Sequence, residues 1–307
     1  MLARTALLFG LLLATQLSGA EPPITAAAFA KDGRSLVVGS QRGLHVYSWP
    51  YLAKLRSIST RLQYVHDLRL SPNNQVLAAV GGSPAEDGRI ELIDWPASEH
   101  VQTQTVGPDV LYRVSWHSSG ERLVVAGPDR RITRLDKSGK VIGCLEGHSR
   151  DVVAVTFLPN GHFVSGSRDN TIRIWEHSSA NLVRTLNNHT DEIIDLAVRP
   201  TSTSAPYVIA SSSADHTVRF WWPIRGRLMR FAKLPSPALD IEWTPDGDRL
   251  VVVCEDGHLR VVDPDTVEVS MDVEVGSSWL YTLAIAPDGG SAFVGGADGL
   301  MQVVKIR

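Results

Sequence analysis

Three aspartates in this sequence share a setting that suits charge chemistry. Asp67, Asp195 and Asp240 each lie inside an apolar segment, three residues before a bulky apolar residue. Carboxylate oxygens brought together at one point would bind a cation. However, Arg113 and Thr282 occupy the matching positions of two other segments. We therefore expect the acids and Arg113 to compensate each other's charge near solvent, rather than to hold a metal.

The sequence offers little other recognisable site chemistry. It contains no G-x-S-x-G nucleophile motif, no H-E-x-x-H zinc motif and no phosphate-binding glycine loop. Its two cysteines, Cys144 and Cys254, lie in apolar segments without C-x-x-C spacing. We expect both to be buried free thiols, because cysteine packs as a small hydrophobic residue. No catalytic residue, cofactor or metal ligand is assigned from the sequence.

A repeat of about 43 residues organises the chain after residue 20. An apolar anchor followed by a short turn, usually with Pro, Asn, Asp or Gly, recurs seven times, with separations of 41, 46, 41, 41, 45 and 42 residues. The anchors are Phe29, Leu70, Trp116, Phe157, Val198, Trp243 and Ile285. Each has an apolar partner two positions earlier, as expected for one face of a β-strand.

Each repeat contains further strand-like segments separated by turns. A second apolar run follows the anchor, an Asp-containing turn follows that run in most repeats, and third and fourth runs complete the unit. Four short strands per 40–45 residues are typical of a propeller blade. The sequence therefore predicts an all-β fold, a seven-bladed β-propeller of four-stranded antiparallel blades. The propeller is expected over residues 21–307, with blades starting near residues 24, 65, 110, 151, 192, 237 and 279.

Composition agrees with a folded, non-membrane domain and gives little support to nucleic-acid binding. The 307 residues are 43% hydrophobic and 21% charged, with 30 Lys+Arg against 33 Asp+Glu and a formal net charge of −3. Apolar content at this level excludes disorder, and the balanced charge argues against a multi-span membrane protein. A nucleic-acid-binding surface would need an excess of Lys and Arg. We expect no nucleic-acid partner.

The fourth repeat resembles those of the WD-repeat propellers, relatives of the G-protein β subunit. It has Gly147-His148 before the first strand, Ser165-Gly-Ser-Arg-Asp169 at the second turn, and Trp175 at the end of the third strand. In that family a His, an Asp, a Ser or Thr and a Trp are hydrogen-bonded across the blade. The resemblance therefore implies two structural tetrads: His148, Asp169, Ser165 or Ser167, and Trp175; and His189, Asp215, Ser211 or Ser213, and Trp221.

Other repeats depart from the family pattern. The sixth repeat has Val262-Asp263 where Trp-Asp is usual, and the third ends its third strand on Leu135. We expect these two blades to depend on apolar packing alone. The seventh repeat stops at its third strand, whereas family members usually complete the last blade with a strand from the opposite terminus. Either the last blade has three strands, or part of residues 1–20 supplies the fourth.

Residues 1–20 have the layout of a secretory signal peptide. Arg4 is the only charge, Ala6–Ala14 is an apolar run, and Ser18 and Ala20 are small residues before a cleavage point. We expect a secreted or periplasmic protein without membrane insertion after cleavage. An uncleaved anchor or a buried first strand is the alternative.

Function then depends on the propeller surface. The turns that enter each first strand share a rim with the Asp-containing turns, and we expect a binding patch there. Its candidate residues are Tyr64, Tyr112, Arg113, Arg150, Arg168, Trp279 and Tyr281. Tyr, Trp and Arg are enriched at interface hot spots. We predict a monomeric, non-enzymatic scaffold that binds a protein or peptide. The alternative is a lactonase-type hydrolase with a metal at the central opening.

Overall fold

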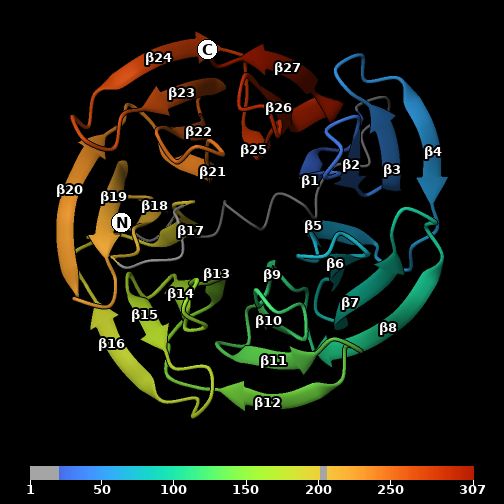
Figure 1. Cartoon of the computed structure of the whole chain (residues 1–307), viewed down its shortest axis with the longest axis horizontal. Helices are drawn as coiled ribbons and strands as arrows, with labels where there is room; N and C mark the ends of the chain where they lie inside the picture. The colour runs from blue at the N-terminus through green and yellow to red at the C-terminus, as the bar shows by residue number, and fades with distance from the viewer. Residues whose placement is uncertain (1–20, 201–205) are drawn as a thin grey trace.

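The computed structural model describes residues 21–200 and 206–307. The expected signal peptide, residues 1–20, lies outside the described residues. Figure 1 shows seven β-sheets arranged around a central axis. The predicted seven-bladed β-propeller is therefore confirmed.

Within each blade the strands follow one another in chain order, from the first strand beside the central axis of the ring to the last strand at its outer edge. Blades 1 to 3 consist of β1 (Ile24–Phe29), β2 (Ser35–Ser40), β3 (Gly43–Ser48) and β4 (Lys54–Ile58); β5 (Tyr64–Leu70), β6 (Val76–Ser83), β7 (Asp87–Asp94) and β8 (His100–Gly107); and β9 (Arg113–Trp116), β10 (Arg122–Ala126), β11 (Ile132–Asp136) and β12 (Val141–Leu145). Blades 4 and 5 consist of β13 (Val152–Phe157), β14 (Phe163–Ser167), β15 (Ile172–Trp175) and β16 (Leu182–Leu186); and β17 (Ile193–Val198), β18 (Ile209–Ser213), β19 (Thr217–Trp222) and β20 (Arg227–Lys233). Blades 6 and 7 consist of β21 (Ala238–Trp243), β22 (Leu250–Cys254), β23 (His258–Val262) and β24 (Val269–Glu274); and β25 (Leu280–Ile285), β26 (Ser291–Gly296), the short 3-10 helix η2 (Ala297–Gly299) and β27 (Met301–Lys305).

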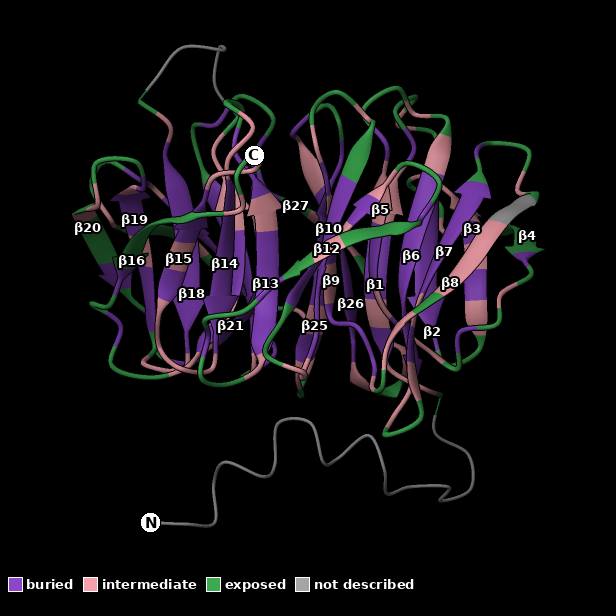
Figure 2. Cartoon of the chain, turned by 90° about the horizontal axis from the view of Figure 1, so that it is seen from below, coloured by how far each residue is buried: buried purple, intermediate pink, exposed green. Residues whose placement is uncertain are grey.

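Burial follows the order of the strands within a blade. The second strands are almost wholly buried, as in β14 and β22, whereas the fourth strands β4 and β16 bury only their last residue. Figure 2 shows this contrast between the purple inner strands and the green outer strands. The first and third strands run upward in that view, so the turns that enter each blade lie on its lower face.

Apolar packing between neighbouring blades forms the core. Seven separate hydrophobic clusters each join two adjacent blades, and the one around Ile24, Leu36 and Phe293 joins blade 1 to blade 7. At these interfaces a glycine of one blade packs closely against a side chain of the next blade. A Cβ on Gly295 would lie 2.5 Å from Cγ2 of Ile24, just as a Cβ on Gly39 would lie 2.6 Å from Cγ1 of Val65. The ring therefore closes through the same contact that joins neighbouring blades.

The last blade has three strands, β25, β26 and β27, among the described residues. This agrees with one of the two arrangements expected from the sequence. Within the described part of the chain, no helix is long and apolar enough to cross a membrane.

Both cysteines are free, but one expectation about them was wrong. Cys254 is buried in β22, whereas Cys144 is exposed. The physical reason is that Cys144 belongs to β12, a fourth strand that is mostly exposed to solvent.

Candidate functional site

The centre of the propeller holds a cluster of charged side chains around Arg113. Arg113 is the first residue of β9, and its side chain is only 15% exposed. Its Nη2 atom lies 3.1 Å from Oδ1 of Asp195 and 3.2 Å from Oδ1 of Asp240, and its Nη1 atom lies 3.6 Å from Oδ1 of Asp67. Arg113 is therefore not a rim residue, which corrects that part of the sequence prediction. The expected Asp–Arg compensation is present, but it is buried rather than near solvent.

Each of these aspartates also joins two blades through the backbone. The Oδ2 atom of Asp67 accepts the N–H of Val114 at 3.0 Å, so blade 2 is bonded to blade 3. Asp195 likewise accepts the N–H of Ile241 at 3.2 Å, and Asp240 that of Leu283 at 2.8 Å. The aspartate three residues before the anchor therefore links the first strands of neighbouring blades by a hydrogen bond from the backbone to its side chain. We refer to Arg113, Asp67, Asp195 and Asp240 as the central cluster.

Burial dominates the electrostatics of this centre. Burial raises the pKa of Asp195. The charge of Arg113 acts in the opposite direction and lowers this pKa, whereas the neighbouring Asp240 raises it further. Burial likewise raises the pKa of Glu242, a nearby acid that accepts the N–H of Ile285 at 3.0 Å, to about 7. Burial opposes the charge on Arg113, but the three aspartates outweigh it and raise the pKa of its guanidinium. Arg113 therefore stays charged and occupies the place where a bound cation would have to sit.

The fourth blade contains a continuous hydrogen-bonded chain of side chains. The indole N–H of Trp175 donates to Oγ of Ser165 at 2.8 Å, and Ser165 Oγ lies 2.8 Å from Nε2 of His148. Nδ1 of His148 lies 2.9 Å from Oδ2 of Asp169. Because the carboxylate only accepts, the proton is on Nδ1 and the Ser165 hydroxyl donates to Nε2. The tetrad uses Ser165, whereas Ser167 bonds the backbone of Arg150.

The fifth blade repeats this arrangement. Trp221 donates to Ser211 at 2.9 Å, Ser211 lies 2.7 Å from Nε2 of His189, and Nδ1 of His189 lies 2.8 Å from Asp215. Ser213, the sequence alternative, instead donates to the carbonyl of Asp191 at 3.1 Å. Both tetrads are enclosed within their blades, so the environment of these histidines and acids indicates a structural role.

Hydrogen bonding determines the ionisation of the tetrad acids. Burial opposes ionisation of Asp169, but hydrogen bonds from His148, Thr171 and the Ser149 backbone outweigh it, and the pKa of Asp169 is well below its usual range. The pKa of Asp215 is lowered by the same balance. Each tetrad thus holds an ionised carboxylate over the ordinary pH range.

The sixth blade does not depend on apolar packing alone, contrary to expectation. Arg260 is buried in β23 and bonds Asp256 at 2.7 Å through Nη2 and Asp272 at 3.0 Å through Nε. His258 reaches the same Asp272 at 2.6 Å. The sixth blade therefore has an arginine–carboxylate network instead of the tetrad found in blades 4 and 5. The third blade, in contrast, packs Leu135 in an apolar cluster with Leu123.

On the lower face, part of the predicted rim patch is continuous. The rings of Tyr64 and His66 lie 6.5 Å apart and nearly parallel, and His66 contacts Tyr112 edge-on at 5.9 Å. Tyr112 is buried against Val110 and Val153, which extends the patch from blade 2 through blade 3 to blade 4. His66 was missed by the sequence analysis, although it lies in the same strand as Tyr64.

Ion pairs continue this surface into blade 5. Arg150 is 56% exposed on its side chain, and its Nη1 atom lies 3.0 Å from Oε1 of Glu192. Arg168 lies 3.3 Å from Asp151 and 3.7 Å from Glu192. We call Tyr64, His66, Tyr112, Arg150 and Arg168 the lower-face patch.

Two of the predicted rim residues lie elsewhere on the ring. Trp279 and Tyr281 contact each other at 6.0 Å between ring centroids, and both are half-buried in or beside β25 of blade 7. Blade 1 lies between them and the Tyr64 side of the patch (Figure 1). The structure therefore divides the predicted rim set into two groups.

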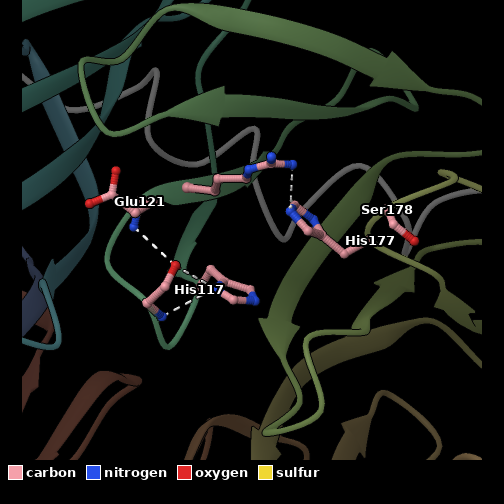
Figure 3. A pocket seen from close by; sticks show the side chains of 6 residues that line it. His117, Glu121, His177 and Ser178 are labelled. Carbon is pink, nitrogen blue, oxygen red and sulfur yellow. Dashed lines mark hydrogen bonds between the residues drawn. The ribbon is translucent and has the colours of Figure 1, made fainter.

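A pocket of about 480 Å³ lies on the opposite face, between blades 3 and 4 (Figure 3). Its lining residues are His117, Ser119, Glu121, Arg122, His177 and Ser178. The rings of His117 and His177 stack at 5.3 Å, and Arg122 donates to Nε2 of His177 at 3.1 Å. Burial, together with Arg122, lowers the pKa of His177 to about 4. No group of three or more potential metal ligands occurs among the described residues.

Comparison with known proteins identifies the repeats. A family model described as WD domain, G-beta repeat, matches residues 139–176, 180–221 and 234–263. Eukaryotic translation initiation factor 3 subunit I from Pyricularia oryzae is 31% identical over 163 residues, which is 52% of this chain and 46% of the relative.

Other relatives match over shorter stretches. The p21-activated protein kinase-interacting protein 1-like of Danio rerio is 28% identical over 45% of this chain and 37% of its own length. Coronin-7 of Mus musculus is 34% identical over 37% of this chain and 13% of its own length. The matches thus span less than half the length of these curated relatives.

Proposed function

Because the chain belongs to the WD-repeat β-propeller family, we propose that it is a non-enzymatic scaffold that binds a protein or peptide partner. The lower-face patch is the proposed contact surface. The names of two relatives, a subunit of a translation initiation factor and a kinase-interacting protein, favour a role in protein assemblies.

The observation that carries this proposal is the continuity of the lower-face patch across blades. Exposed Arg150 and the half-buried Tyr64, His66 and Arg168 lie at this surface, and the buried ring of Tyr112 joins its parts from blade 2 to blade 4. Aromatic and arginine side chains bury a large area with few rotors, which makes them frequent hot spots. The backbone that carries these residues belongs to hydrogen-bonded sheets or to the turns that enter them, which limits the entropy lost by the backbone on binding.

The alternative function, a hydrolase with a metal at the central opening, is disfavoured by the central cluster. Carboxylates that would bind the metal already receive a guanidinium, with Arg113 at 3.1 Å from Asp195 and 3.2 Å from Asp240. A metal would have to displace a buried cation that bonds these acids directly.

The lower-face patch gives the first test. The double variant Tyr64→Ala/Arg150→Ala is expected to bind the partner at least tenfold more weakly, because it removes one aromatic and one charged contact, each of the size found at hot spots. Quantitative mass spectrometry of proteins captured from the native host by the immobilised full chain would measure this. Tyr51→Ala is the matched control, since Tyr51 is 86% exposed and lies on the opposite face. Equal capture by the patch variant and the wild type would reject the patch as the contact surface.

We also propose that the scaffold acts outside the cytoplasm, in a secreted or periplasmic location. The support is the layout of Met1–Ala20, with one charge, an apolar run and small residues before the cleavage point. N-terminal sequencing of the protein recovered from its host is expected to begin at Glu21. A protein that retains Met1 or Leu2 and fractionates with the cytosol would contradict export.

A further inference from the structure

One segment of blade 5 differs in charge from the rest of the chain. Residues 216–239 contain four arginines and one lysine but no aspartate or glutamate, although the whole chain has a net charge of −3. This segment includes β19, β20 and the turn Pro223–Gly226 between them, which lies on the upper face. Such a concentration of one sign attracts groups of the opposite charge.

The turn arranges its arginines around one aromatic ring. The guanidinium carbon of Arg225 lies 5.3 Å from the ring centroid of Trp222, and that of Arg227 lies 5.6 Å from it. Arg184, from β16 of blade 4, lies across Gly226, where a Cβ would be 2.4 Å from its Cδ atom. Ile224 in the same turn is 38% exposed. We call Arg184, Trp222, Ile224, Arg225 and Arg227 the arginine–tryptophan corner.

Comparison with equivalent arginines shows that this corner has unused donors. Arg56, Arg184 and Arg230 occupy equivalent places in the fourth strands of their blades. They lie opposite Val46, Ile174 and Phe220, each the last residue of the third strand before the register shifts. Arg56 donates to the carbonyl of Pro96 at 2.7 Å, and Arg230 pairs with Asp265 on the next blade. The side chain of Arg184 makes no hydrogen bond or ion pair within residues 21–200 and 206–307.

The other two arginines of the corner are also without carboxylate partners. In the described part of the chain, the guanidinium groups of Arg225 and Arg227 lie over the Trp222 ring and make no hydrogen bond or ion pair, whereas Arg219 of the same segment pairs with Asp215 at 3.3 Å. Three guanidinium groups therefore face solvent together. The position of Arg225 and Arg227 over the Trp222 ring limits the rotamers of these two side chains, so less entropy is lost when they form hydrogen bonds.

We propose that the arginine–tryptophan corner binds an acidic segment of a partner protein. Asp or Glu carboxylates of that segment accept paired N–H bonds from Arg225, Arg227 and Arg184, because the guanidinium fork matches a carboxylate. An apolar residue of the segment packs on Ile224. Nucleic acid is disfavoured, because base stacking needs an open aromatic face and the arginines lie over Trp222.

This site goes beyond the proposed function, since it lies on the face opposite the lower-face patch. A scaffold with separate sites on its two faces holds two partners at once. The two sites share no residue, so each is tested by its own variants.

The test uses a fluorescein-labelled octaglutamate peptide and the full chain. Fluorescence anisotropy is expected to show saturable binding that weakens with salt, and Arg225→Gln/Arg227→Gln is expected to weaken it at least tenfold. Arg56→Gln is the matched control, because Arg56 also lies 5.3 Å from a tryptophan ring, that of Trp95, but its N–H groups are already bonded. The control variant and Tyr64→Ala/Arg150→Ala are expected to bind octaglutamate like the wild type.

Three outcomes would overturn this proposal. They are the absence of saturable binding by the wild type at low salt, an equal loss in Arg56→Gln, and tighter binding of an eight-nucleotide oligothymidylate than of octaglutamate. The last result would assign the corner to nucleic acid. Because the altered side chains are exposed, unchanged melting of the variants is expected to exclude misfolding as the cause.

Discussion

Replacing Arg113 with methionine is expected to lower the free energy of unfolding at neutral pH by about 3–5 kcal/mol, the usual cost of removing one partner from a buried ion pair. Asp67, Asp195 and Asp240 would then remain in the centre of the ring without their shared cation. All three acids also bond the backbone of the next blade. The cost of burying them without a cation therefore acts directly on three interfaces between blades. The effect should therefore be a loss of stability of the whole ring rather than of one loop.

Denaturant unfolding followed by tryptophan fluorescence would measure this loss. Arg150→Met is the matched control, because the Arg150 side chain is 56% exposed and its pair with Glu192 is worth at most about 1 kcal/mol. Adding Asp195→Asn and Asp240→Asn to Arg113→Met is expected to restore most of the stability by removing the uncompensated charges. A loss below about 1 kcal/mol in Arg113→Met would show that the central cluster does not bear on folding.

The fold was predictable because propeller blades repeat their physical requirements. The anchors from Phe29 to Ile285 recur at nearly constant spacing, since every blade must bury the same face against its neighbours. The tetrads of blades 4 and 5 follow from the family pattern for the same reason. The choice of Ser165 over Ser167 needed coordinates, because both serines lie in β14, two residues apart, and only Ser165 bonds His148.

The sites were less predictable because they depend on which neighbours meet across blades. The repeat register aligns Arg113 with the aspartates, but Arg113 is separated from Asp240 by 127 residues, and only the structure shows that the three acids share this one buried guanidinium. Arg260 was missed because Asp272, one of its two acidic partners, comes to lie opposite it only when β23 and β24 pair. The charge of residues 216–239 is visible in the sequence, but only the structure shows which of its arginines lack carboxylate partners.

The tetrad of blade 4 is expected to lose stability as one unit. Asp169→Ala is expected to cost about 2–3 kcal/mol, because it removes a charge-assisted acceptor from the imidazole N–H of His148. His148→Ala should cost a similar amount, since it leaves Asp169 and Ser165 without their common partner. In the double variant the second change removes little more, so the two losses should be non-additive by about 1–2 kcal/mol.

The contribution of Asp169 also has a defined pH dependence. Its pKa is lowered by folding, so its stabilisation is fully present above the unfolded-state pKa of about 4 and is lost progressively as pH falls from there through the lower folded-state pKa. The difference in unfolding free energy between the wild type and Asp169→Ala, measured in denaturant between about pH 7 and pH 3, should therefore be constant at the neutral end and become smaller at the acid end. Asp32→Ala is the control, because Asp32 is an exposed turn residue that bonds only the backbone of Arg34. Simple additivity of the His148 and Asp169 variants, together with a constant difference across this pH range, would contradict a coupled tetrad.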